Sequence, residues 1–137
     1  MPKCAARLLN MTKILSENEV KKITGVSKKQ YKNVHWHTAT IVVKQFISLS
    51  EYVDIVRKII SDCKTDDNNI ATELIDFSIR VNIISSYSFV DLPKDIDELY
   101  YIVYASDLFD TVCSVANKEQ VKTLISTVMS MVGIGVN

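Results

Sequence analysis

The sequence predicts a mainly α-helical fold, a four- or five-helix, bundle-like domain with a small β-hairpin or strand in its N-terminal third. Three observations lead to this expectation. The chain has only three glycines and two prolines, few for a turn-rich β-sandwich. Apolar residues recur at helical spacing along most of the chain after residue 48. Residues 34–47 are instead rich in β-branched and aromatic residues, which are typical of one or two strands.

The first predicted helix begins at a capping box. Ser16 and Glu19 stand three residues apart, so each side chain can accept a hydrogen bond from the backbone N–H of the other residue. Gly25 is expected to end this helix, because glycine adopts the left-handed conformation found after many helices. Ser27 is then expected to cap a second short helix over residues 28–33.

The remaining helices are each expected to begin at a residue that caps well. Ser48 opens a second capping box and a helix with one apolar stripe, which begins at Leu49. Residues 70–86 are apolar nearly all round, as in a helix at the centre of a bundle. Asp95 and Asn117 cap the next helices. A shift of the apolar phase at Ser106 is compatible with one bent helix or with two short ones.

The net charge of zero hides a division along the chain. Residues 1–47 carry nine basic and two acidic side chains, whereas residues 48–137 carry seven basic and fourteen acidic ones. This asymmetry suits an acidic partner or the head-to-tail stacking of copies. We expect a basic N-terminal helical segment, residues 1–34, followed by a helical domain, residues 35–137, that a short β element opens. Met11 could serve as the natural start in place of Met1.

Nothing in the sequence indicates catalysis, and we expect no enzymatic activity, no cofactor and no metal. The three cysteines form no CxxC pair, and Cys63 and Cys113 fall on apolar stripes, where free cysteine is usually a small core residue. His35 and His37 would share one face of a strand, but no second group of metal ligands accompanies them. Because no segment reaches the ~20 apolar residues of a membrane span, we expect a soluble protein without membrane contact.

The basic segment contains the pattern of a helix-turn-helix. Residues 19–33 combine an apolar first helix, a glycine turn and a basic second helix, and so resemble the DNA-binding element of bacterial repressors. In that interpretation Lys28, Lys29 and Lys32 would contact nucleic acid. A β-rich segment follows where a third helix should be, so we favour a basic face for protein binding or assembly. Its candidate residues are Lys21, Lys22, Lys28, Lys29 and Lys32.

A second set of candidate contact residues is apolar or aromatic. Three tyrosines fall within five positions of one predicted helix, and they cannot all face one core. Tyrosine is enriched at subunit interfaces. An exposed strand at residues 41–46 could also pair with a neighbouring molecule. The candidates are Trp36, Ile41, Val43, Tyr100, Tyr101 and Tyr104.

Several short features follow one another in a fixed order: Trp36, Ile41-Val42-Val43-Lys44, Leu49-Ser50, Asp76-Phe77-Ser78-Ile79-Arg80, Leu92-Pro93 and Tyr101-Ile102-Val103-Tyr104-Ala105-Ser106-Asp107-Leu108. From Trp36 to the C-terminus, this order resembles that of small proteins encoded in the structural gene blocks of tailed bacteriophages of Gram-positive hosts. The basic front segment lies outside the resemblance.

This resemblance implies a non-enzymatic virion or morphogenesis protein: a head-to-tail connector, a completion protein or a tail assembly chaperone. Such a protein would form a homo-oligomer or bind other virion subunits, in the virion or in the cytoplasm of the bacterial host. Two alternatives remain open, a small helix-turn-helix DNA-binding regulator and a phage-encoded inhibitor of a host defence protein.

Overall fold

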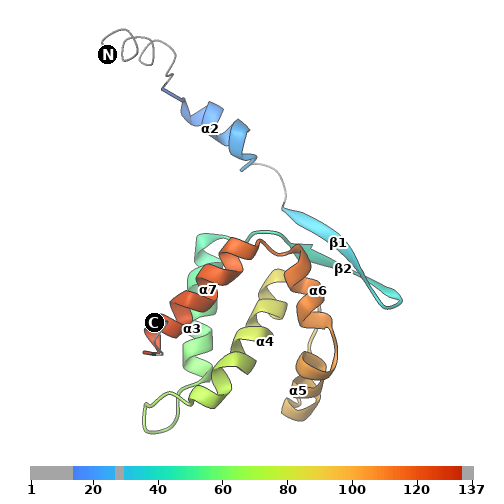
Figure 1. The fold of residues 1–137 in the computed structure, drawn as a ribbon, viewed down its shortest axis with the longest axis vertical. Coiled ribbons are helices and arrows are strands. Elements are labelled where there is room, and N and C mark those ends of the chain that lie inside the picture. Colours follow the sequence, from blue (N-terminus) through green and yellow to red (C-terminus); the bar gives the residue numbers. More distant parts are fainter. Residues whose placement is uncertain (1–13, 27–29, 134–137) are drawn as a thin grey trace, which may run out of the picture.

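The structure, a computed structural model, describes residues 14–26 and 30–133 and confirms the mainly helical fold (Figure 1). Six α-helices and a two-stranded antiparallel hairpin lie within these residues. The elements are α2 (Glu17–Thr24), β1 (Tyr31–Trp36), β2 (Ala39–Lys44), α3 (Leu49–Asp62), the 3-10 turn η1 (Thr72–Leu74), α4 (Ile75–Tyr87), α5 (Ile96–Ala105), α6 (Leu108–Val115) and α7 (Lys118–Met131).

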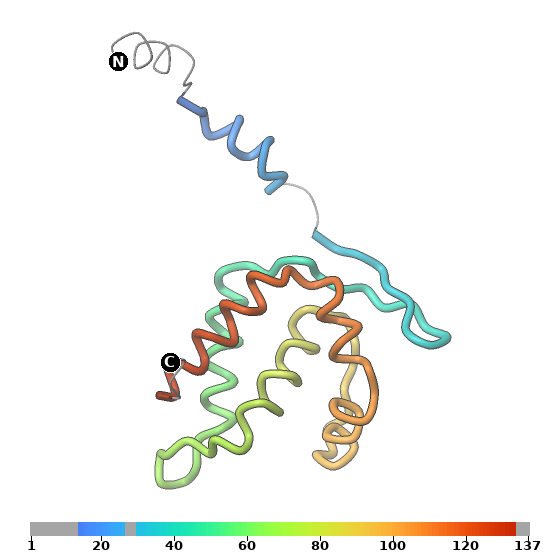
Figure 2. Tube along the Cα trace, viewed as in Figure 1, coloured from blue at the N-terminus to red at the C-terminus, as the bar shows by residue number. Residues whose placement is uncertain are grey.

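Helices α3 to α7 form one body, and the hairpin lies across one end of it (Figures 1 and 2). Helix α4 is the central element and packs against α3, α5 and α6. Helix α7, far from α3 in the sequence, lies beside it. Helix α2 stands away from the body in Figure 1, and none of its residues is buried.

The two predicted capping boxes are both present. The Ser16 hydroxyl accepts from the backbone N–H of Glu19, and the Glu19 carboxylate reaches back to the cap. Ser48 makes the same reciprocal pair with Glu51 at the start of α3. Gly25 ends α2 with φ 68° and ψ 25°, the left-handed conformation that glycine adopts without a side-chain clash. The local sequence therefore predicts both ends of α2.

The predicted second helix over residues 28–33 is wrong where the structure describes it. Tyr31 to Asn33 belong to β1, and residues 27–29 lie outside the described part of the chain. Tyr31 pairs with Lys44 and Val34 with Ile41 in the hairpin. The backbone hydrogen bonds of that pairing outweigh the weak local preference for a helix in a short basic stretch. The strand accordingly begins three residues before its expected position.

The turn of the hairpin places one of the two predicted strand histidines differently from expectation. His37 lies in the turn between β1 and β2 with φ 57°, while His35 remains in β1 opposite Thr40. The two histidines therefore do not share a strand face. Val34 and Trp36 pack against the core together with Ile41 of β2. This face of the hairpin is held to the body through α6.

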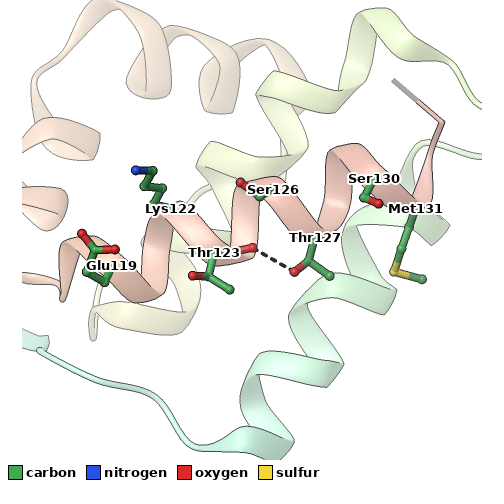
Figure 3. Close-up of a pocket in the computed structure, with 7 residues that line it drawn as sticks. All are labelled: Glu119, Lys122, Thr123, Ser126, Thr127, Ser130 and Met131. Atoms are coloured by element: carbon green, nitrogen blue, oxygen red, sulfur yellow. Dashed lines mark hydrogen bonds between the residues drawn. The ribbon is translucent and has the colours of Figure 1, made fainter. Parts of the chain in front are cut away.

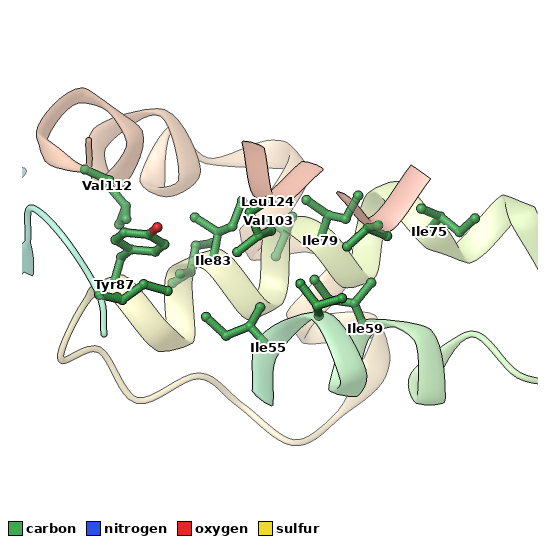
Figure 4. Close-up of a cluster of buried hydrophobic side chains, with 14 of the residues drawn as sticks. Ile55, Ile59, Ile75, Ile79, Ile83, Tyr87, Val103, Val112 and Leu124 are labelled. Atoms are coloured by element: carbon green, nitrogen blue, oxygen red, sulfur yellow. The ribbon is translucent and has the colours of Figure 1, made fainter. Parts of the chain in front are cut away.

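The core confirms that α4 is the central helix. Seven of its residues are buried, and Figure 4 shows several of them between side chains of α3, α5, α6 and α7. Its α-helical part begins at Ile75, after η1, rather than at residue 70. Leu49, predicted to lie on the apolar stripe of α3, is 78 % exposed, and Ile55 is buried instead. The largest fully buried side chains are Val43, Ile47, Ile59, Ile75, Ile83, Ile84, Tyr87, Val103, Leu108, Val112, Leu124 and Val128.

The phase shift at Ser106 separates two short helices. Ser106 ends α5 in an extended conformation, with φ −109° and ψ 169°. Its hydroxyl donates to the carbonyl of Ile102 and accepts from the backbone N–H of Leu108 at 3.3 Å. Because these bonds satisfy backbone groups on both sides of the break, α6 can begin with its own apolar phase.

One side-chain amide connects three parts of the body. Gln120 of α7 accepts from the Ile47 N–H at 2.9 Å and donates to the Ile47 carbonyl at 3.0 Å. The same amide oxygen accepts from the Tyr87 hydroxyl at 2.7 Å. The backbone N–H of Asn117 donates to the Gln45 carbonyl at 2.6 Å. The segment that joins β2 to α3 is thereby tied to α4 and α7.

Replacing Gln120 should destabilise the protein more than replacing the tyrosine that bonds it. Gln120→Leu removes the partner of three groups, the N–H and carbonyl of the buried Ile47 and the Tyr87 hydroxyl. We expect the free energy of unfolding to fall by about 2–4 kcal/mol. Tyr87→Phe removes one hydrogen bond and should lower the free energy of unfolding by about 1 kcal/mol. Urea unfolding measures both changes, with Glu119→Leu on the exposed side of α7 as the control. Equal losses for Gln120→Leu and Glu119→Leu would contradict this account.

An ion pair joins the hairpin to the start of α3. Lys44 Nζ lies 2.8 Å from Glu51 Oε2. The hydrogen bond from Lys44 is the main cause that lowers the pKa of the Glu51 carboxyl. Burial raises this pKa in part, and hydrogen bonds with Ser48 lower it further. A carboxyl whose pKa is lower in the folded than in the unfolded state stabilises the fold above its unfolded pKa. That contribution disappears as the pH falls through the folded pKa.

Glu51→Gln should therefore reduce stability at neutral pH and have progressively less effect in acid. Glutamine keeps the shape of the cap but carries no charge for Lys44 to bind. Urea midpoints of the wild type and the variant, compared at neutral pH and well below the ordinary pKa of glutamate, measure the difference. A difference that stays constant across this range would show that the ionised pair contributes nothing.

Candidate interaction surface

Large apolar side chains remain exposed beside a groove between α4 and α5. We call this the α4–α5 groove. It has a volume of about 580 Å³ and lies at the end of the body away from the hairpin. Ile96 and Tyr100 on its α5 side are 62 % and 58 % exposed. Lys58, Asp62 and Asp97 supply charges, and its other lining residues are Leu74, Phe77, Ser78, Val81, Asn82 and Leu99.

Aromatic rings form one wall of the α4–α5 groove. The Phe77 ring centroid lies 5.8 Å from that of Tyr100 and 6.1 Å from that of Tyr104. Tyr100 and Tyr104 are 5.0 Å apart. Rings at these separations attract one another beyond their simple burial. The wall is thus built from side chains that hold each other in place, an arrangement common at protein interfaces.

Polar contacts fix Tyr104 at the back of this wall. Its hydroxyl donates to Asp76, and Arg80 lies over its ring at 5.0 Å from the centroid. Arg80 also pairs with Asp76 at 3.0 Å and lies 4.7 Å from the Phe109 ring centroid. Burial, followed by the bond to Asp76, raises the pKa of Tyr104 to about 12. Tyr104 is therefore a neutral, oriented donor at physiological pH, while its neighbour Tyr100 faces solvent.

The second exposed apolar feature is α2 with its flanking residues, which we call the arm (residues 15–26). Val20 and Ile23 lie three positions apart, on one side of the helix. Ile23 is 71 % exposed, and Leu15 and Val26 at the two ends are also exposed. Isolated helices shorter than about 12 residues are marginal in water. A two-turn helix with no buried residue therefore gains little tertiary stabilisation from the part of the chain that the structure describes.

The predicted basic residues do not gather on one described surface. Lys21 and Lys22 lie on the arm, where Lys21 pairs with Glu17 at 3.1 Å, and Lys32 is exposed on β1. Lys28 and Lys29 lie outside the described residues. Because Lys32 is on a strand, the structure does not contain the basic second helix of a helix-turn-helix at that residue.

The predicted aromatic and apolar candidates divide into two groups. Tyr100, Tyr101 and Tyr104 share α5, but Tyr101 lines a separate shallow hollow with Asp97, Glu98 and Ile102. Trp36, Ile41 and Val43 instead hold the hairpin to the body. Val43 is fully buried and Ile41 is partly buried against the core.

Trp36 makes a specific contact with the junction of α5 and α6. Its Nε1 donates to Asp107 Oδ1 at 2.7 Å, and its ring meets that of His37 edge-on. His37 Nε2 lies 3.7 Å from the same carboxylate oxygen. Sequence position alone does not reveal this pairing, because seventy-one residues separate the tryptophan from its acceptor.

The strand edge open for pairing is not the one expected. Residues 41–46 were expected to offer it, but β2 pairs with β1 on one side and with the segment after α4 on the other. Val43 forms an isolated bridge with Ser88, and Phe89 N–H donates to the Val42 carbonyl at 3.2 Å. The outer edge of the hairpin belongs to β1.

Two of the groove residues differ in burial from what their sequence pattern predicts. Leu74 and Ile96 fit apolar helical stripes and look like core residues, yet both are exposed. Phe77 is partly buried against the core, as its pattern predicts, and also lines the groove. Leu74 immediately precedes the first turn of α4 and Ile96 is the first residue of α5, and this position at a helix start is the sequence signal that sets them apart.

Other hollows offer less varied chemistry. A polar hollow of about 430 Å³ runs along α7, and Figure 3 shows that all of its lining residues come from that single helix.

Burial raises the pKa of the Cys113 thiol to about 11 and also raises that of Cys63, which disfavours the reactive thiolate. Within residues 14–26 and 30–133, no cluster of three His, Cys, Asp or Glu side chains is placed to hold a metal ion. None of the helices described there is long and apolar enough to cross a membrane.

The contact between Trp36 and Asp107 can be followed by fluorescence, because Trp36 is the sole tryptophan of the chain. Asp107→Ala removes the acceptor, and we expect a tryptophan that acrylamide quenches more readily. The cost in stability should be about 1 kcal/mol, since one partly exposed hydrogen bond is lost. Asp110→Ala, one turn further along α6, should leave quenching unchanged. Identical quenching in the wild type and both variants would mean that the contact does not form in solution.

Comparisons with protein-family models, with curated proteins and with solved structures give no match to this chain. The geometry of the α4–α5 groove and of the arm therefore provides the basis for a functional proposal.

Proposed function

We propose that this chain is a structural or assembly subunit of a tailed bacteriophage, and that it acts through protein–protein contacts without catalysis. One observation carries the proposal: the helical body exposes an apolar groove at one end, and the amphipathic helix α2, which has no buried residue, stands away from the body in Figure 1. Surfaces of this kind, on a chain of this size, are typical of contact sites.

The charge distribution supports the same conclusion. The basic surplus lies in the first third of the chain and the acidic surplus in the helical body. Asp62 and Asp97 lie at the groove, with Asp95 and Glu98 at the start of the same helix α5. Opposite charges at two ends of a subunit favour its ordered addition to another copy or to an acidic partner surface.

The pieces that resemble phage proteins also meet in the fold. Trp36 contacts Asp107, and Asp76 contacts both Arg80 and Tyr104. Each of these contacts joins residues within the features that carry the resemblance. These residues support a body that presents the groove, which is consistent with the resemblance to a virion or morphogenesis protein.

The proposal predicts that the chain occurs in many copies in phage particles or in their assembly intermediates. Mass spectrometry of purified particles and of intermediates from infected cells tests this, with the phage lacking the gene as the control. Deletion should halt morphogenesis at a defined step. Salt-dependent DNA binding that Lys28→Glu and Lys29→Glu abolish, together with absence from particles and intermediates, would instead favour a DNA-binding regulator.

A further inference from the structure

We infer that the arm of one copy docks into the α4–α5 groove of a second copy of this chain, so that subunits join head to tail. The inference rests on the proposed function as a subunit that acts through protein contacts, and it names the partner. It accounts together for two features of the described residues, an amphipathic helix with no buried residue and an apolar groove with large side chains exposed beside it.

The arm has the pattern required of a helix that binds in a groove. Such helices present apolar anchors at three- and four-residue spacing, as Val20 and Ile23 do. Leu15 and Val26, just beyond the two helix ends, are exposed apolar residues as well. The capping box at Ser16 and the left-handed Gly25 define both ends before binding, which reduces the entropy lost on docking.

The groove offers surfaces that match these anchors. Phe77, Val81 and Leu99 are partly buried against the core, and Ile96 and Tyr100 stand exposed beside them. The aromatic wall is fixed by its ring contacts, so binding does not have to order it. A preformed apolar site with one exposed tyrosine is typical of the centre of an interface.

Charge favours a basic occupant. The described lining contains Asp62 and Asp97 against the single cation Lys58, which is itself paired with Asp62 at 3.1 Å. Within the arm Lys21 and Lys22 are balanced by Glu17 and Glu19, and the basic surplus comes from the sequence around it, which has Lys13 before the arm and Lys28 and Lys29 after it. An acidic segment in this groove would face like charges, which are unfavourable across an interface.

The length of the chain favours a second copy over the arm's own groove. Residues 26–30 join the arm to β1, and a fully extended link of this length spans about 20 Å. Helix α4 begins at the groove and ends at Tyr87, next to Ser88, which bridges to the hairpin. Its thirteen residues span about 20 Å, so the hairpin and the groove are about this far apart. To reach its own groove, the link would have to run taut along the whole body. Figure 1 shows the arm directed away from the body instead.

This contact is not self-complementary, which determines how an assembly grows. Each copy has one arm and one groove, on different surfaces, so the second copy can bind a third. Heterologous contacts of this type produce a ring when the rotation closes and a filament when it does not. A ring of subunits is consistent with the proposed role in a phage particle.

Sedimentation velocity of the full-length chain over a concentration series tests the inference. The wild type should form species larger than a dimer. Ile23→Asp on the arm and Tyr100→Asp in the groove should each weaken association at least about tenfold, as expected for central interface residues. Asn18→Asp, on the opposite side of α2, and Tyr101→Ser, outside the groove, are the matched controls. Circular dichroism verifies that the helical body of each variant is folded.

A mixture of the two defective chains gives the decisive result. The Ile23→Asp chain keeps an intact groove and the Tyr100→Asp chain keeps an intact arm, so one contact can form between them. Together they should form a 1:1 dimer that cannot grow, although each alone is monomeric. A monomeric wild type, or association that Ile23→Asp leaves unchanged, would overturn the inference. Either result would leave the proposed function to be decided by the presence of the chain in particles.

Discussion

The amide side chain of Gln120 is the contact on which the arrangement of this protein depends most. It bonds both backbone groups of Ile47 and the hydroxyl of Tyr87, at a point where the hairpin, α4 and α7 meet. Buried backbone groups outside regular structure need such partners. Because the backbone groups of Ile47 have partners, the chain can pass from β2 to α3 inside the core, and the hairpin has a fixed position on the body.

A fixed hairpin position separates the two surfaces of the molecule. Helix α4 runs from the Ser88 bridge at the hairpin to the groove at the other end, and its buried residues hold the remaining helices around it. The arm precedes the hairpin, and the groove lies where α4 and α5 begin. The core thus keeps the amphipathic helix of the basic N-terminal segment apart from the aromatic groove, whose lining includes Asp62 and Asp97. This separation is the basis of the contact that we propose between copies.

The helical caps were predictable because their signals are local. Ser16, Ser48, Asp95 and Asn117 each accept a backbone hydrogen bond from the residue three positions later, as their residue types indicate. The strand at Tyr31 was not predictable in this way, since its partner Lys44 lies beyond the turn. The candidate site was predicted only in part. Tyr100 and Tyr104 were identified from their crowding on one helix, whereas the apolar residues Leu74 and Ile96 looked like core.

The sequence by itself determined the helical class, the central position of α4, the caps and the division of charge, because each follows from neighbouring residues or from apolar periodicity. Tertiary structure decided which apolar residues stay exposed. Val43 is buried and Leu49 exposed although both are apolar, since burial depends on which elements meet around a residue. It also decided that Trp36 binds Asp107 and that Phe77 joins Tyr100 in a groove. These contacts form between elements distant in the chain, and periodicity contains no information about such distances.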